Sequence, residues 1–121
     1  MKAAQFKGKL NMKQGASISV NLTVFLYEED SIHYALCPAL DILGYGKNEE
    51  EAKSSFQIML SEILSDAISK GNLFSLLEFY GWHKNQPPKT SELIVRNREL
   101  AKLVDTRPYK TMQENISLPC A

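Results

Sequence analysis

The sequence predicts an α+β domain in which a small antiparallel β-sheet carries one long helix on one face. Three observations support this prediction. Apolar and polar side chains alternate along residues 17–27, a pattern typical of a strand with one buried face. A second apolar stretch ends at Pro38, which lacks the N–H that a sheet ladder needs. Asn48 then precedes a long segment of helical periodicity and has the side chain of a good helix N-cap.

Composition and length indicate one globular domain. Of 121 residues, 44% are hydrophobic and 23% are charged, which are ordinary values, and a chain of this length can bury a core without disulfides. Cys37 and Cys120 form neither a disulfide framework nor the CxxC pair of a zinc site. No stretch is long enough to cross a bilayer, and lysines interrupt the first apolar residues, unlike in a signal peptide. We therefore expect a cytoplasmic protein without a membrane segment.

The net charge of zero conceals a strong asymmetry. Residues 1–27 contain four lysines and no acidic residue, whereas residues 28–82 contain three lysines and ten acidic residues. Residues 83–121 contain seven basic and four acidic residues. An acidic centre of this kind repels phosphate backbones and attracts basic partners. A solvated surface that keeps the protein in solution is an equally good explanation of the same charges.

The first part of the chain is predicted to supply the strands. Residues 3–12, where lysines separate the few apolar side chains, suit an edge strand, and a turn follows within residues 11–16. The clearest strand covers residues 17–27. Residues 28–31, with the sequence Glu-Glu-Asp-Ser, form the turn of a hairpin, and residues 32–37 form the returning strand.

The capped helix follows a short extended segment. Residues 41–46 contain two glycines, which permit either a close approach of another backbone or a positive φ. The helix covers about residues 49–69, with Glu51 placed to complete a capping box and Gly71 as its stop. Its apolar stripe, which should pack on the sheet, consists of Ala52, Phe56, Met59, Leu60, Ile63, Ala67 and Ile68.

The last part of the chain is predicted to be mainly helical. Residues 73–82 are apolar and aromatic and fit either a short helix or a strand. Residues 83–89, with a Pro-Pro pair, form a linker. Residues 91–104 have the pattern of an amphipathic helix, and residues 115–119 that of a short terminal strand.

The stretch around the start of the long helix resembles the HicB family of antitoxins. The resemblance rests on Tyr-Ala-Leu-Cys-Pro-Ala-Leu-Asp at residues 34–41, on Gly-Tyr-Gly at residues 44–46 and on Asn-Glu-Glu-Glu-Ala at residues 48–52. The family's pattern is a strand that ends in Cys-Pro-x-Leu, a glycine-containing strand and a Thr/Asn-x-Glu-Glu-Ala helix start. The match covers about residues 20–70. Its motifs mark turns and caps, so they predict the fold better than the function.

The resemblance implies a β-β-β-α-β module, described as a partial ribonuclease-H-like fold. In the family this module binds and occludes a small basic ribonuclease toxin of the HicA type, and the acidic centre of this chain agrees with such a partner. Family members commonly end in a helix-turn-helix or ribbon-helix-helix domain that binds operator DNA. Here the linker of residues 83–89 is too long for the turn of a helix-turn-helix, and no strand followed by two helices comes after it. We therefore expect no DNA binding.

The residues that could do chemistry form no recognisable catalytic or metal site. His33 and Cys37 lie four residues apart on one predicted strand, about 13 Å, which is beyond hydrogen-bond reach. Acidic residues are ordinary in turns. The four that a metal-dependent nuclease could use as ligands fall mostly in the predicted hairpin turn: Glu28, Glu29, Asp30 and Asp41. The sequence therefore predicts no catalytic residue, no metal and no cofactor.

We predict that these same four acidic residues bind the protein partner, together with Tyr45. Tyr45 lies between two glycines and has two interpretations. It is either a half-buried aromatic residue that covers the helix start or an exposed anchor for a partner. The other clustered aromatic residues are interpreted first as core or dimer-interface residues: Phe79, Tyr80 and Trp82.

These observations lead to one hypothesis and two alternatives. The α+β module of residues 1–82, followed by a helical extension of residues 83–121, would be a non-catalytic HicB-like antitoxin. It would form a homodimer, because short sheets expose edges. One alternative is an HicB-like dimeric interaction module with no toxin. The other is an RNA-binding or regulatory protein that uses the basic residues of its first strand: Lys2, Lys7, Lys9 and Lys13.

Overall fold

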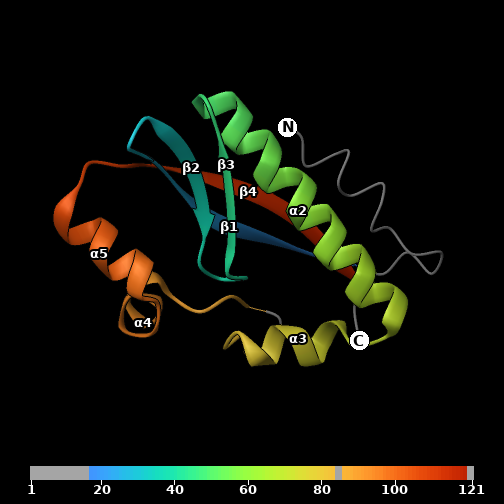
Figure 1. Ribbon diagram of the computed structural model, residues 1–121. Coiled ribbons are helices and arrows are strands. Elements are labelled where there is room, and N and C mark those ends of the chain that lie inside the picture. The colour runs from blue at the N-terminus through green and yellow to red at the C-terminus, as the bar shows by residue number, and fades with distance from the viewer. Residues whose placement is uncertain (1–16, 84–85, 120–121) are drawn as a thin grey trace.

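The structure, a computed structural model, describes residues 17–83 and 86–119. It confirms the predicted α+β class, because four strands form one antiparallel sheet in the order β3-β2-β1-β4 and a long helix lies on one face (Figure 1). The strand predicted for residues 3–12, the turn after it, the four lysines of the RNA-binding alternative and Cys120 lie outside the described residues. The strands are β1 Ser17–Glu29, β2 Ile32–Cys37, β3 Ile42–Gly46 and β4 Lys110–Pro119.

A two-residue turn joins β1 to β2. Glu29 still pairs with the first residue of β2, so only Asp30 and Ser31 lie in the turn, with φ angles of 53° and 67°. Two positive φ angles are those of a primed hairpin turn, whose twist matches that of the flanking strands. The turn predicted for residues 28–31 is therefore too long, because Glu28 also remains in the ladder.

Helix α2 covers Glu49–Lys70, one residue beyond the predicted end. The Asn48 side chain accepts a hydrogen bond from the Glu51 N–H over 2.9 Å, and the Glu51 carboxylate accepts one from the Lys47 N–H over 2.8 Å. Gly71, at a φ of 72°, ends the helix in the left-handed conformation. Both predicted caps are confirmed, although the reciprocal bond of the capping box reaches one residue further back than expected.

A glycine brings α2 close against β3. A Cβ added to Gly44 would lie 2.8 Å from both the Ala52 carbonyl oxygen and the Phe56 Cα, closer than side-chain carbons approach a backbone. Gly44 does not have a positive φ, so its role is close backbone approach. The predicted helix stripe lacks Leu64, which is buried together with four residues of that stripe: Ala52, Phe56, Leu60 and Ala67.

The two faces of the sheet have different covers. Gly44 lies opposite Ala35, which lies opposite Leu26, so the even-numbered side chains of β1 share the face that α2 covers. Odd-numbered side chains of β1 point to the other face. There the Phe25 ring lies 5.4 Å from that of Tyr109, which precedes β4. The buried residues of β1 on the α2 face are Val20, Leu22, Val24 and Leu26.

The segment after α2 is a helix rather than a strand. Helix α3 covers Leu73–Phe79, so of the two possibilities for residues 73–82 the structure shows the helix. The Trp82 side chain follows it and is buried, and its Nε1 donates a hydrogen bond to the Ala39 carbonyl oxygen over 2.8 Å. This bond attaches the segment to the loop between β2 and β3.

Two short helices replace the single helix predicted for residues 91–104. They are α4 Thr90–Arg96 and α5 Arg98–Thr106. Asn97 separates them because its backbone is extended, with φ −113° and ψ 111°, and its side chain accepts a hydrogen bond from the Leu100 N–H over 3.0 Å. The prediction of one helix was wrong because an asparagine that can cap a new helix competes with continuation of the old one.

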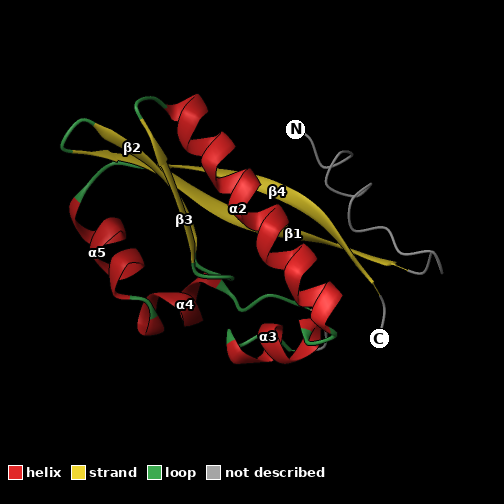
Figure 2. Cartoon of the chain, turned by 45° about the vertical axis from the view of Figure 1, so that its right-hand side comes forward, coloured by secondary structure: helices red, strands yellow, loops and turns green. Residues whose placement is uncertain are grey.

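The terminal strand is longer than the predicted residues 115–119 and belongs to the sheet. β4 pairs with β1 from Pro119 opposite Ser17 to Lys110 opposite Leu26. The chain beyond residue 83 therefore passes through α4 and α5, on the side of the sheet away from α2, and then returns to add β4 as an edge strand beside β1 (Figure 2). Among the described residues, no helix is both long enough and apolar enough to cross a membrane.

Candidate partner-binding surface

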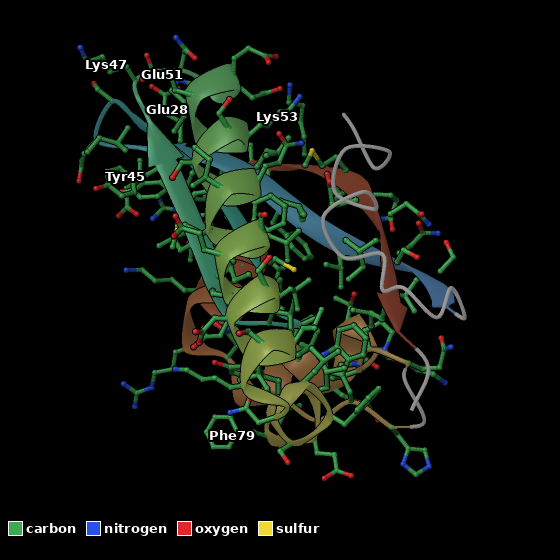
Figure 3. All side chains as sticks on the ribbon, turned by 90° about the vertical axis from the view of Figure 1, so that its right-hand side faces the viewer. Glu28, Tyr45, Lys47, Glu51, Lys53 and Phe79 are labelled. Atoms are coloured by element: carbon green, nitrogen blue, oxygen red, sulfur yellow. The ribbon has the colours of Figure 1, made fainter. Side chains whose placement is uncertain are left out.

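Six carboxylates gather at one end of the sheet. β3 runs antiparallel to β2, so its last residue, Gly46, lies opposite His33, next to the β1–β2 turn. The start of α2 therefore comes close to the hairpin tip, and Figure 3 shows Glu28 and Glu51 at the same end of the molecule. The carboxylates come from two elements that are twenty residues apart in the sequence: Glu28, Glu29 and Asp30 of the tip, and Glu49, Glu50 and Glu51 of the helix.

The structure brings together four of the five predicted partner-binding residues. The three acidic residues of the tip lie at the end of the sheet where Tyr45 also lies, near the end of β3. Asp41 is at the other end. It precedes β3, has a φ of 56° and is separated from the tip by the full length of β2. Asp41 therefore does not belong to the same surface.

Three of the six carboxylates pair with basic side chains of the chain, among them Glu50 with Lys53 Nζ over 4.0 Å. Glu49 contacts Lys110 Nζ over 2.7 Å and Lys53 Nζ over 3.3 Å. The hydrogen bond from Lys110 is the main reason why the pKa of Glu49 lies below its ordinary value, and Lys53 adds to this effect while partial burial opposes it. Glu29 pairs with Arg107 over 3.3 Å.

The hairpin tip keeps its negative charge. Glu28 has an exposed side chain, and the basic group near it is His33, whose Nε2 is 3.9 Å from the carboxylate. Within the described residues, neither Glu28 nor Asp30 pairs with a lysine or an arginine. Both carboxylates are thus open to a cation from outside, although Lys110, which pairs with Glu49, lines the same hollow. We call Glu28 and Asp30 the acidic tip.

Three tyrosines lie side by side next to the acidic tip. The rings of Tyr27 and Tyr34 are stacked, with centroids 5.2 Å apart and an angle of 23° between their planes. Tyr34 lies directly opposite Tyr45, so the three side chains cross β1, β2 and β3 on the face away from α2. We call them the tyrosine row. Tyr45 is 63% exposed and so does not cover the helix start, although its N–H donates a hydrogen bond to Ser55 Oγ over 3.2 Å.

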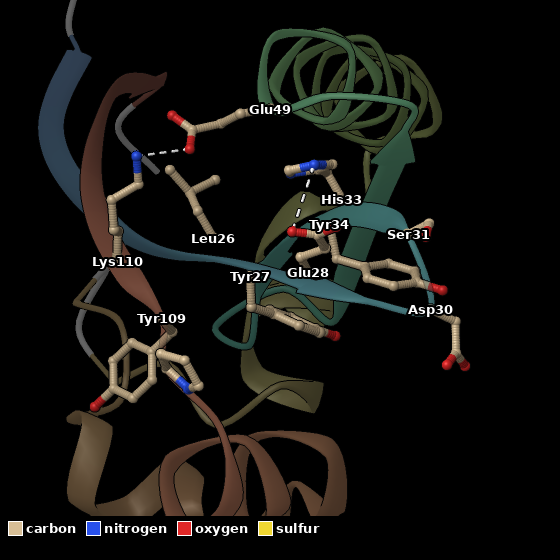
Figure 4. A pocket seen from close by; sticks show the side chains of 11 residues that line it. Leu26, Tyr27, Glu28, Asp30, Ser31, His33, Tyr34, Glu49, Tyr109 and Lys110 are labelled. Atoms are coloured by element: carbon tan, nitrogen blue, oxygen red, sulfur yellow. Dashed lines mark ion pairs between the residues drawn. The ribbon is translucent and has the colours of Figure 1, made fainter.

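A shallow hollow of about 460 Å³ joins the acidic tip to the tyrosine row (Figure 4). It exists because β4 begins opposite Leu26, so the last three residues of β1 have no β4 residue beside them. In Figure 4 the side chains of Glu49 and His33 lie on the α2 side of the strands, whereas Tyr27 and Tyr109 lie on the side of the C-terminal helices. The hollow is thus open to both faces of the sheet end.

The two side chains first considered for catalysis lie at opposite ends of β2, with His33 beside the acidic tip and Cys37 opposite Ile42. Burial raises the pKa of the Cys37 thiol to about 12, so this thiol stays protonated at neutral pH and is a poor nucleophile. His33 contacts Glu28 rather than Cys37. Among the residues that the structure describes, no three His, Cys, Asp or Glu side chains are grouped closely enough to hold a metal ion.

Fold and surface together define an α+β domain with an acidic, tyrosine-bearing sheet end. Comparison of the chain with protein-family models, with curated proteins and with solved structures gives no match.

Sequence reasoning missed Tyr27 and Tyr34 as members of the surface. A signal was present, because a two-residue turn at Asp30 and Ser31 fixes which residues of the two strands face each other. With that register, Tyr27 and Tyr34 become partners. The turn assumed for residues 28–31 hides this pairing, because it removes two residues from β1.

Proposed function

We propose that this protein is a non-catalytic HicB-like antitoxin of the cytoplasm that binds and occludes a small basic ribonuclease toxin of the HicA type. The observation that carries the proposal is the acidic tip, where Glu28 and Asp30 keep their charge beside exposed aromatic surface. The order of strands and helix agrees with the module that the family resemblance implies. It supports the fold part of the resemblance and leaves the activity to experiment.

The proposed mechanism is electrostatic attraction followed by steric occlusion. A toxin that cleaves RNA needs a basic surface for the phosphates, and a protein with an uncancelled acidic tip competes for that surface. Carboxylates at the rim of an interface mainly raise the association rate and its dependence on salt, whereas buried aromatic anchors slow dissociation. The acidic tip would attract the toxin, and the tyrosine row beside it would hold it.

We further propose that the antitoxin is a homodimer. Among the strands that the structure describes, β3 and β4 are the edges of the sheet, and exposed edges are surfaces that natural proteins cover or pair. Size-exclusion chromatography with light scattering tests this part: a mass near twice 13.7 kDa is expected, and a mass of one chain at micromolar concentration would contradict it.

The proposed function is tested by co-expression with the short basic protein encoded by the adjacent reading frame. We expect that protein to arrest growth alone, and co-expression with this chain to restore growth and to give a complex that co-purifies. Restoration of growth should weaken when the charge at the sheet end is removed. The variant for this test carries three substitutions: Glu28→Gln, Asp30→Asn and Glu50→Gln.

A matched control changes the same number of charges elsewhere. Glu62, Asp66 and Glu78 are exposed acidic residues on α2 and α3, away from the hairpin, and their amide replacements should leave toxin binding intact. Asn at position 30 also tolerates the positive φ of the turn, so the fold is preserved. Equal toxin affinity of the two triple variants would show that the acidic tip does not contribute to the interface. Absence of both rescue and a complex with the wild-type chain would end the antitoxin proposal.

A further inference from the structure

We propose that the tyrosine row docks a cationic side chain, foremost the guanidinium of an arginine, from the basic protein partner. This inference rests on the proposed function, because the cation is taken to belong to the protein that the acidic tip attracts. It goes further by naming the chemical group that docks and the side chains that receive it.

The row supplies the aromatic faces. A cation is attracted to an aromatic ring when it lies over the ring face within about 6 Å of the centroid. Tyr27 and Tyr34 are already stacked at 5.2 Å, and Tyr45 continues the row on the edge strand with 63% of its surface exposed. An arginine side chain is planar and stacks on such rings better than a lysine does. The outer end of the row therefore fits a guanidinium.

The carboxylates beside the row select a cation over other groups that stack on tyrosine. Asp30, in the turn, lines the same hollow as Tyr34, and Glu28 lines it from the α2 face. Among the described residues neither carboxylate forms an ion pair with a lysine or an arginine. A nucleic-acid base could stack on the same rings, but its phosphates would meet these carboxylates. Charge complementarity thus favours a basic protein as the occupant.

An arginine of the chain itself occupies the inner end of the row. Arg107 Nη1 lies 3.3 Å from Glu29 Oε1, and Arg107 and Tyr27 line one small hollow with Leu103. Here a guanidinium pairs with a hairpin carboxylate and shares a hollow with a tyrosine of the row. Further along the row, Tyr34 and Asp30 line the larger hollow and offer the same two kinds of group to a cation from outside.

The test uses the full chain and a fluorescein-labelled peptide, Gly-Arg-Gly-Arg-Gly-Arg-Gly. The same peptide with citrulline in place of arginine has the same shape without the charge. Fluorescence anisotropy at low salt measures Kd for each variant. We expect the arginine peptide to bind at least about tenfold more tightly than the citrulline peptide, because each of three positions loses its charge.

Substitutions in the row identify where the cation docks. We expect Tyr45→Leu, which keeps an apolar side chain but removes the ring, to raise Kd for the arginine peptide about threefold. Tyr45→Phe keeps the ring face and should change Kd by less than about twofold. Phe79 is the matched control, because it is 75% exposed and lies at the opposite end of the molecule in Figure 3. Phe79→Leu should leave Kd unchanged.

Three results would overturn the proposal. An unchanged Kd in Tyr45→Leu, with a native circular dichroism spectrum, would show that the row does not receive the cation. Equal binding of the arginine and citrulline peptides would remove the role of charge. Binding of a uridine 12-mer, weakened by Tyr45→Leu while the arginine peptide does not bind, would show an RNA-stacking surface instead. The proposed function is judged separately, by rescue of growth with the wild-type chain: such rescue together with an unchanged peptide Kd in Tyr45→Leu would leave the antitoxin intact and remove only the arginine site.

Discussion

The close approach of α2 to β3 at Gly44 predicts that a single added methyl group destabilises the protein strongly. In Gly44→Ala the new Cβ would lie 2.8 Å from the Ala52 carbonyl oxygen and the Phe56 Cα, and it would also meet the Phe56 N. Carbon atoms pack at about 3.5 Å or more, so the helix backbone has to retreat by roughly 1 Å. Such a retreat loosens the contacts of the whole buried stripe, and overpacking of this kind costs about 3 kcal/mol.

Urea unfolding measures this cost, with the fluorescence of Trp82, the chain's one tryptophan, as the probe. With an m-value of about 1.5 kcal/mol/M, Gly44→Ala should lower the midpoint by about 2 M. Gly71→Ala is the matched control. Gly71 has a φ of 72° but nothing within 4 Å of an added Cβ, so only the left-handed conformation costs energy, about 1 kcal/mol. A smaller loss in Gly44→Ala than in Gly71→Ala would refute the argument that steric contact with α2 dominates.

Three further predictions concern single side chains. The folded-state pKa of Glu49 lies below its ordinary 4.5, so the contribution of this carboxylate to folding stability is present above pH 4.5 and is lost as pH falls through the folded pKa. Lys110→Met should raise the pKa of the Glu49 carboxyl in an NMR titration, and an unchanged pKa would contradict the bond between Lys110 and Glu49. The pKa of Cys37 is raised from 9.0 to about 12, so the protonated thiol stabilises the fold below pH 9.0 and this effect is lost as pH rises towards 12. In a Cys120→Ser chain, Cys37 should react with Ellman's reagent at pH 8 only after unfolding. A rapid reaction of the native protein would disprove the burial of Cys37. Asn97→Ala removes the cap of α5 and should cost about 1 kcal/mol in urea unfolding, whereas an unchanged midpoint would show that the cap is dispensable.

The parts of the fold that depend on neighbouring residues could be predicted from the sequence. Alternation along β1, the stop at Pro38, the cap at Asn48 and the end at Gly71 all depend on contacts within a few residues. The pairing of β4 with β1 could not be predicted, because it joins residues about ninety positions apart and nothing local in β4 specifies its partner. The break at Asn97 had a local signal, but periodicity across it favoured one helix.

The candidate surface was predictable only in its charge. Glu28, Glu29 and Asp30 are adjacent in the sequence, so their position at one tip follows from any hairpin. Their proximity to the start of α2 depends on the antiparallel return of β3, and the isolation of Asp41 depends on the same return. Which carboxylates stay uncancelled depends on cations from the far end of the chain, because Arg107 and Lys110 approach only when β4 joins the sheet. No sequence pattern contains that information.

The turn at Asp30 and Ser31 determines both properties of the surface. Its two positive φ angles keep the turn at two residues, and that length fixes Tyr27 opposite Tyr34. One additional residue in the turn would shift the register and move the facing side chains of one strand to the opposite face of the sheet. Tyr34 would then point toward α2, and the row would be broken between β1 and β3. Asp30 therefore belongs both to the acidic tip and to the turn that holds the tyrosines in line, so charge and aromatic surface cannot be separated by changes in loop length, only by substitution of single side chains.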